Sequence, residues 1–169
     1  YAPVRPATGV SMTRRYLLGN EAIAHAAVEA SVDFVSGYPG TPSSEVIDIL
    51  RAQGERPLYV EWSVNEKVAF EVGLGAAFAG ARVLATMKHV GVNVAADPLF
   101  TAAYTGVDGP LVLVSADDPG MASSQNEQDN RRYAVAAGIP MLEPSSSQEA
   151  YDFTLAAFEL SARFRLPVI

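Results

Sequence analysis

The chain has 169 residues, enough for one domain with a sizeable buried core. Its net charge is −7, its pI is about 4.7 and it has no stripe rich in lysine and arginine, so nucleic acids and anionic membranes are not expected partners. Cysteine is absent, which excludes disulfides, iron–sulfur ligation and Cys-based metal sites in this sequence, and with 2 histidines a His-rich metal site is not expected. We expect no metal site here. We also expect a cytoplasmic location, since neither a secretory signal nor a run of about 20 apolar residues is visible.

Helix and strand signals alternate along the chain. A helix is expected over residues 20–30 with Asn20 as its N-cap, followed by a short strand over 33–36. A second helix is expected over 41–52, with Thr41 as N-cap, Pro42 at the first helical position and Gly54 just past the end. The remaining expected elements are a strand over 58–62, a helix over 63–80, a strand over 82–87, a helix over 93–104, a strand over 111–116, a helix over 127–137, a short strand over 141–142, a helix over 147–163 and the start of a strand over 166–169.

This alternation predicts the fold class. Short apolar strands separated by helices are typical of an α/β domain with a doubly wound parallel sheet and helices on both faces. Residues 1–11 read as a loose extension before Met12, and residues 12–169 as one domain. Because the apolar run 166–169 ends the sequence just as a strand begins, we expect this domain to be truncated at its C-terminus.

Ligands of such folds bind at the carboxyl ends of the strands. The loops expected there are rich in Gly, Ser, Asn and charged residues, and they cover residues 37–44, 63–66, 88–93 and 117–130. Four such loops at one edge of a sheet predict a site. Standard phosphate and hydrolase signatures do not support it, because no P-loop motif and no Gly-x-Ser-x-Gly elbow is present, and no Gly-x-Gly-x-x-Gly follows a strand.

Glu66 is the most informative residue of these loops. At about 100° per residue it shares a helix face with small and apolar residues, while Lys67 and Glu71 lie on another side and can pair with each other. The residues that share the face of Glu66 are Ala69, Phe70, Gly73, Ala77 and Gly80. An unpaired carboxylate in apolar surroundings has a raised pKa, the condition for exchanging protons near neutral pH. The alternative is structural, since Ser63-x-x-Glu66 also matches a capping box.

Four motifs, in order, resemble the 2-oxoacid:ferredoxin oxidoreductases that depend on thiamine diphosphate, and their indolepyruvate branch in particular. The motifs are Gly37-Tyr38-Pro39-Gly40-Thr41-Pro42-Ser43-Ser44-Glu45, the Asn65-Glu66 helix, Met87-Lys88-His89-Val90-Gly91-Val92-Asn93, and Asp117-Asp118-Pro119-Gly120 through Asp129. The resemblance covers roughly residues 15–169. It implies an N-terminal domain of the thiamine diphosphate fold that binds the pyrimidine half of the cofactor.

The resemblance also implies residue roles. Family members carry a Glu at the position of Glu66, which hydrogen-bonds the pyrimidine ring and promotes its imino tautomer, so Glu66 is the expected catalytic and cofactor-binding residue. Thr41, Lys88 and His89 are expected to bind the substrate. Tyr38, Pro39 and Asn93 are expected to contact the cofactor. The residues alone leave plainer readings open: an ordinary N-cap for Thr41 and for Asn93, a packing residue for Tyr38, and a solvated loop for the pair at 88–89.

Two departures from the family pattern limit these roles. Pyruvate-specific relatives carry an Arg after the fourth strand, and the stretch 115–119 has none, which favours a bulkier aryl-pyruvate such as indolepyruvate. The Gly-Asp-Gly segment that binds diphosphate and Mg²⁺ is also missing, because residues 107–110 read as a turn. Mg²⁺ and the 4Fe-4S clusters are therefore expected on other domains or another subunit, in a dimer or heteromer.

The leading interpretation is part of an oxidoreductase that decarboxylates a 2-oxo acid, transfers the acyl group to coenzyme A and passes electrons to ferredoxin. The chain alone is expected to be inactive. A second interpretation is a non-catalytic thiamine-fold module that serves assembly or regulation through the small-residue helix face. A third is a flavodoxin-like binder of a small molecule.

Overall fold

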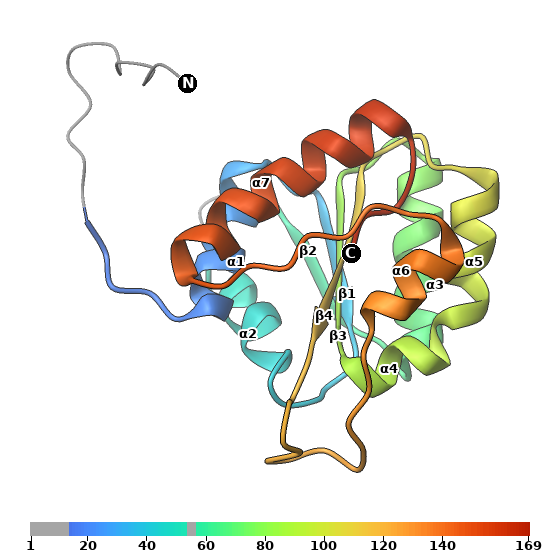
Figure 1. Ribbon diagram of the computed structural model, residues 1–169. Coiled ribbons are helices and arrows are strands. Elements are labelled where there is room, and N and C mark those ends of the chain that lie inside the picture. Colours follow the sequence, from blue (N-terminus) through green and yellow to red (C-terminus); the bar gives the residue numbers. More distant parts are fainter. Residues whose placement is uncertain (1–13, 54–56) are drawn as a thin grey trace, which may run out of the picture.

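Figure 1 shows the computed structural model, which describes residues 14–53 and 57–169. The expected extension over residues 1–11 and the helix-ending Gly54 lie outside these ranges. The described residues form a four-stranded parallel sheet in the order β2-β1-β3-β4. Its strands are β1 (Phe34–Gly37), β2 (Tyr59–Trp62), β3 (Val83–Lys88) and β4 (Leu111–Ala116).

Helices cover both faces of this sheet, which confirms the predicted doubly wound α/β fold (Figure 1). One face carries α1 (Gly19–Glu29), α2 (Ser44–Ala52) and α7 (Ser147–Phe164). The other face carries α3 (Glu66–Phe78), α4 (His89–Val94), α5 (Ala96–Thr105) and α6 (Arg131–Ala137). Among the described helices, none combines the length and the hydrophobicity needed to cross a bilayer.

The two faces have separate apolar cores because successive side chains of a strand point to opposite sides. On β4, Leu111 and Leu113 pack with Phe70 of α3, whereas Val112 packs with Phe158 of α7. Every residue of β3 is buried, which fits its central position with helices on both sides. This rigid sheet fixes the positions at which the site loops begin.

The starts of the first two helices differ from the prediction. In α1 the N-cap position is Leu18, and the Asn20 side chain instead donates to the Pro42 carbonyl (2.8 Å). The helix expected from Thr41 begins at Ser44, and the Thr41–Pro42 peptide is cis. Thr41 is therefore no N-cap and Pro42 is not the first helical residue. The Ser43 backbone and hydroxyl both donate to the Gly40 carbonyl, so these residues form a turn that precedes the helix.

Three later elements also differ. The helix expected over 93–104 is two helices, α4 and α5, and Asn93 lies inside α4 instead of capping a helix. The helix expected from residue 127 begins at Arg131. Residues 141–142 form no strand, although the Leu142 N–H donates to the Ile169 carbonyl (2.9 Å). At the chain end, Val168 makes an isolated parallel bridge with Val112, so the expected strand is present only as this bridge.

Candidate functional site

The site lies where the strands end at their carboxyl edge. Glu66 is the first residue of α3, which follows the end of β2. Its neighbour Asn65 is the N-cap, and Asn65 Oδ1 accepts a hydrogen bond from the Val68 N–H (2.9 Å). The Ser63 hydroxyl donates to Glu61 Oε1 (2.9 Å) instead. The alternative of a capping box is therefore wrong, and Glu66 is not committed to capping its own helix.

The Glu66 side chain is half-buried and lies against the backbone of α4. A Cβ atom built on Gly91 would be 2.5 Å from Glu66 Cγ and 2.8 Å from Glu66 Oε1. Among the described residues, the Glu66 carboxylate has no ion pair and no hydrogen bond. The nearest cation in the sequence is engaged elsewhere, since Lys67 Nζ lies 2.8 Å from Asp97 Oδ2 and 3.9 Å from Glu71 Oε1. The expected Lys67–Glu71 pair is thus present, and Glu66 is left available for a ligand.

The small-residue face of α3 packs on its own sheet. The Ser36 hydroxyl of β1 donates to the Ala69 carbonyl (2.6 Å), and both groups are buried. A Cβ atom on Gly73 would be 3.0 Å from Val83 Cγ1 and 3.2 Å from Ser36 Oγ. The expectation that this face is open to a partner is therefore wrong, because β1 and β3 already occupy it.

Lys88 and His89 join β3 to α4, and both are buried, with exposed fractions of 8% and 1%. Lys88 Nζ donates to the Ser123 carbonyl (2.7 Å), and the stem of the Lys88 side chain lies under Gly40. His89 Nε2 lies 3.0 Å from the Asn126 carbonyl and carries the hydrogen there, since a carbonyl can only accept. Its Nδ1 is buried with no hydrogen-bond partner in the described part of the chain. The plainer reading of this pair as a solvated loop is therefore wrong.

The segment of residues 117–130, which we call the covering segment, folds over this pair. The side chains of Gln128 and Asn130 both donate to the His89 carbonyl (3.0 Å each). Asn93 exchanges hydrogen bonds with Gln128 (2.9 Å each) and accepts one from the Tyr133 hydroxyl (2.5 Å). The tertiary bonds of Gln128 and Asn130 explain why helix α6 begins only at Arg131.

Two carboxylates of the covering segment differ in environment. Asp118 accepts hydrogen bonds from the Ser124 hydroxyl (2.6 Å) and the Ser123 N–H (2.8 Å), which hold the pKa of Asp118 below its usual range. Burial raises the pKa of Asp117, because removal from water disfavours the charged carboxylate more than the Ser115 hydroxyl and nearby His89 favour it. The segment is thus organised around a charged Asp118.

A cavity of about 590 Å³ lies beneath the covering segment. It is lined by His89, Asp117, Asp129, Arg131 and Glu143 among others, and acidic residues outnumber basic ones in its wall. Glu66 does not line this cavity. Glu66 and this cavity are therefore separate features of the sheet edge, and Glu66 itself is half-buried.

The other predicted residues lie on the first loop of this edge. Tyr38, Pro39 and Thr41 are exposed, and the loop contacts the Lys88 stem through Gly40. Within residues 14–53 and 57–169, no hydrogen bond joins these three side chains to Glu66. The structure thus brings Lys88, His89 and Asn93 together with the covering segment, whereas Tyr38 and Thr41 share only the sheet edge with Glu66, at the ends of the paired strands β1 and β2.

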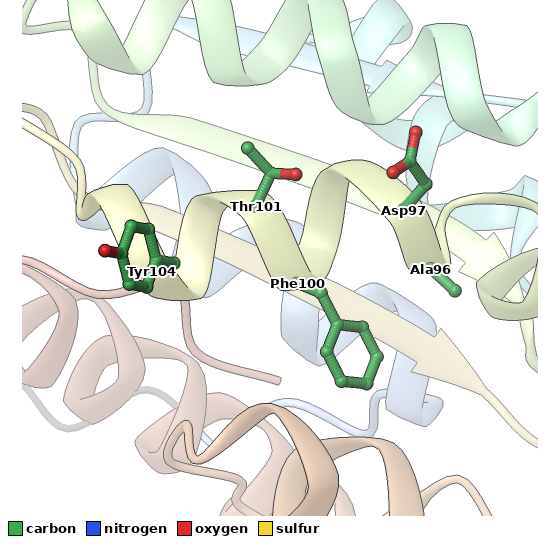
Figure 2. Close-up of a pocket in the computed structure, with 5 residues that line it drawn as sticks. All are labelled: Ala96, Asp97, Phe100, Thr101 and Tyr104. Atoms are coloured by element: carbon green, nitrogen blue, oxygen red, sulfur yellow. The ribbon is translucent and has the colours of Figure 1, made fainter.

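A second hollow, of about 470 Å³, lies on the outer face of α5. Figure 2 shows its lining residues along one helix: Ala96, Asp97, Phe100, Thr101 and Tyr104. None of the predicted site residues lines it, and its carboxylate, Asp97, is paired with Lys67. We therefore assign the functional site to the sheet edge and not to this surface.

Two features of the site escaped the sequence reasoning. The contact of Gly91 with Glu66 joins α3 to α4, and only the position of Gly91 within a loop motif hinted at it. The bonds of Gln128 and Asn130 to His89 depend on a crossing of loops that no local pattern encodes. In the described ranges, no group of three or more His, Cys, Asp or Glu residues could hold a metal ion.

Comparisons with known proteins agree with this architecture. A family profile described as "Pyruvate flavodoxin/ferredoxin oxidoreductase, thiamine diP-bdg" matches residues 25–169. The indolepyruvate oxidoreductase subunit IorA of Archaeoglobus fulgidus is 58% identical over 171 residues, covering 98% of this chain and 27% of the relative. The corresponding subunit of Pyrococcus abyssi is 54% identical and covers 92% of this chain and 24% of the relative.

More distant proteins match as well. The 2-oxoglutarate synthase subunit KorA of Methanothermobacter marburgensis is 33% identical, covering 94% of this chain and 44% of the relative. A solved 2-oxoglutarate:ferredoxin oxidoreductase from Magnetococcus marinus superposes with a TM-score of 0.78 at 20% identity, over 90% of this chain and 28% of that one. At this identity the structural likeness shows the fold. The chain spans about a quarter of the length of the IorA relatives.

Proposed function

The chain belongs to the pyruvate flavodoxin/ferredoxin oxidoreductase family, in its thiamine diphosphate-binding part, and we propose that it supplies the pyrimidine half of that cofactor's site. The observation that carries this proposal is Glu66. Its carboxylate starts a helix at the carboxyl edge of a parallel sheet, has no ion pair or hydrogen bond among the described residues, and rests on the bare backbone of Gly91. Such a carboxylate is free to bond a ring nitrogen of a heterocycle.

The residues of this chain fit the pyrimidine half of thiamine diphosphate. Glu66 would hold the pyrimidine ring through a hydrogen bond and share a proton with it. Tyr38, Pro39 and Asn93 would lie around the same half of the cofactor. Thiamine diphosphate, when bound, supplies the reactive carbon and the electron sink for decarboxylation of a 2-oxo acid. The chain's own contribution is to place the carboxylate and to bind and orient the reactants.

The substrate proposed is a 2-oxo acid of the aryl-pyruvate type. Support comes from the names of the IorA relatives and from the lack of Arg in residues 115–119. Lys88 and His89 would face the substrate, together with Thr41. The ammonium of Lys88 donates to the Ser123 carbonyl and makes no ion pair within 4 Å among the described residues, so the charge of Asp118 acts on it only from a longer distance. It could therefore pair with the carboxylate of a substrate.

The rest of the reaction belongs to parts outside this chain. We propose that the diphosphate, Mg²⁺ and the 4Fe-4S clusters are held by other domains of the same or another subunit. Coenzyme A would take the acyl group and ferredoxin the electrons. Support comes from the coverage of the relatives, since about three quarters of their length has no counterpart here. The domain assignment over residues 12–169, the dimer or heteromer and the cytoplasmic location remain predictions.

Replacing Glu66 with Gln in the complete enzyme tests this function. Gln keeps the shape of the side chain but cannot exchange a proton, so we expect turnover of the 2-oxo acid to fall by about 10²–10⁴-fold. Folding should be retained, because the Glu66 carboxylate makes no bond to lose in the described structure. Steady-state kinetics and thermal unfolding measure the two effects.

The matched control is Glu71→Gln, five residues further along α3 and on another side of the helix. Glu71 is exposed and pairs only weakly with Lys67, so turnover should stay within about twofold of the unaltered enzyme. Near-normal turnover in the Glu66→Gln enzyme would contradict the proposed function. The competing role as an assembly module has less support, because the small-residue face of α3 is buried on its own sheet.

A further inference from the structure

Gly91 is the residue on which the Glu66 side chain rests. The three heavy atoms nearest to a Cβ built on Gly91 all belong to Glu66: Cγ at 2.5 Å, Oε1 at 2.8 Å and Cδ at 3.0 Å. Gly91 is buried within α4, so this contact lies in the packed interior between α4 and the first turn of α3. No side chain larger than a hydrogen atom fits at residue 91 while Glu66 keeps its position.

The backbone of Gly91 does not itself require glycine. Its φ angle lies outside the left-handed region, unlike those of Gly80, Gly106, Gly120 and Gly138. Inside a helix, glycine is less favourable than alanine, because it loses more conformational freedom on folding. The local conformation therefore favours a side chain at residue 91, and the space taken by Glu66 is the feature that opposes one.

From this geometry we propose that Gly91 is a positioning residue, whose missing side chain sets where the Glu66 carboxylate lies. The inference rests on the proposed role of Glu66 and adds a second residue to it. A methyl group at residue 91 would have to push Glu66 Cγ away by about 1 Å to reach normal van der Waals separation. Glu66 has a flexible side chain and no hydrogen bond or ion pair that holds it among the described residues, so it can move without unfolding the domain, at a cost in stability that removal of its side chain would relieve.

The exact position of the Glu66 carboxylate matters far more for proton exchange than for folding. A misplacement of about 1 Å can cost on the order of 10²-fold in rate. Gly91→Ala should therefore separate the two properties: the enzyme stays folded and retains its cofactor, while the proton exchange that depends on Glu66 slows. A purely structural glycine would show the opposite pattern, with loss of stability and little change in exchange.

The test uses the complete enzyme and two readouts besides turnover. The first is the exchange of the cofactor's thiazolium ring proton with deuterium, followed by quenched NMR without substrate. The Gly91→Ala enzyme should exchange at least tenfold more slowly, and Glu66→Gln at least as slowly. The control Gly75→Ala lies in α3, where an added Cβ meets nothing within 4 Å, and should exchange at the unaltered rate.

The second readout is thermal unfolding of the cofactor-free enzyme in a double-mutant cycle. Glu66→Ala removes the atoms that clash with a methyl group at residue 91. The change in Tm caused by Gly91→Ala should therefore be more favourable in the Glu66→Ala protein than in the unaltered protein. This arm remains informative when Gly91→Ala alone folds poorly. Recovery of folding in the double variant supports the contact, and failure of both variants overturns it.

The outcomes separate the two proposals. Slow exchange in Glu66→Gln with unaltered exchange in Gly91→Ala overturns the role of Gly91 and leaves the proposed function intact. Unaltered exchange in Glu66→Gln overturns the proposed function and the positioning role with it. Slow exchange in both variants, with unaltered exchange in Gly75→Ala, supports both.

Discussion

At the start of α3, two adjacent polar side chains have different roles. Asn65 closes the helix end by accepting the Val68 N–H, which leaves the Glu66 carboxylate available for a ligand. The sequence predicted that Glu66 would lack a cation, because the helical period places Lys67 on another side. It did not identify Asn65 as the cap. Ser63-x-x-Glu66 is an equally good local pattern, and the contact of Ser63 with Glu61 decides against it.

We expect the covering segment to be sensitive to acid because of Asp118. Its folded-state pKa is lowered, so its stabilising contribution is present above the ordinary carboxyl pKa and is lost as pH falls through the lower folded value. Asp118→Asn should therefore speed hydrogen exchange at the Ala122 and Ser123 amides at neutral pH and weaken its pH dependence. Amide exchange by NMR measures both effects.

Asp117→Asn is the contrasting variant. Burial raises the pKa of Asp117, so its charged form is unfavourable in the folded state, and the penalty disappears as pH falls through the raised value. Removing the charge should leave the Ala122 and Ser123 amides as protected as before and slightly raise Tm at neutral pH. Equal loss of protection in both variants would contradict the account of the covering segment.

Among the elements, α3 packs on the sheet through Gly73, where an added Cβ would be 3.0 Å from Val83 Cγ1. Gly73 faces Val83 and Ser36, and the Ser36 hydroxyl is fixed by its bond to the Ala69 carbonyl. Gly73→Ala should lower the free energy of unfolding by about 1–3 kcal/mol, because a methyl group overpacks this contact. Gly75→Ala, on the open side of the same helix, should raise it by about 0.5–1 kcal/mol.

Denaturant unfolding of the two glycine variants measures this difference. Since both substitutions add the same methyl group to one helix, the helix preference cancels in the comparison. Equal stabilisation by both would mean that α3 has room to move away from the sheet, and the fixed position of Glu66 would lose its support.

The order and type of most elements could be predicted, because apolar strands and amphipathic helices alternate clearly. The ends of these elements could not be predicted where the residues at the ends form hydrogen bonds with distant parts of the chain. Gln128 and Asn130 bond the His89 carbonyl instead of starting a helix, and Asn20 bonds Pro42 instead of capping one. The strand expected at residues 141–142 is reduced to two backbone bonds with Ile169, from the Leu142 N–H to the Ile169 carbonyl and from the Ile169 N–H to the Pro140 carbonyl.

For the whole molecule, two apolar cores on opposite faces of one sheet make a rigid edge at which the loops converge. The sequence predicted this edge because parallel strands present their carboxyl ends together. It could not show that Lys88 and His89 are buried beneath the covering segment, which depends on loops that cross. The half-buried Glu66 carboxylate has no hydrogen bond or ion pair among the described residues, which fits half of a shared site.

The most direct test of the proposal that Glu66 binds the pyrimidine ring is a structure of the complete enzyme with thiamine diphosphate bound. We expect a hydrogen bond of about 2.6–3.2 Å between a Glu66 carboxylate oxygen and a nitrogen of the pyrimidine ring, with the Glu66 side chain still in contact with Gly91. A pyrimidine ring bound at the cavity beneath the covering segment, or a Glu66 carboxylate turned into solvent, would contradict it.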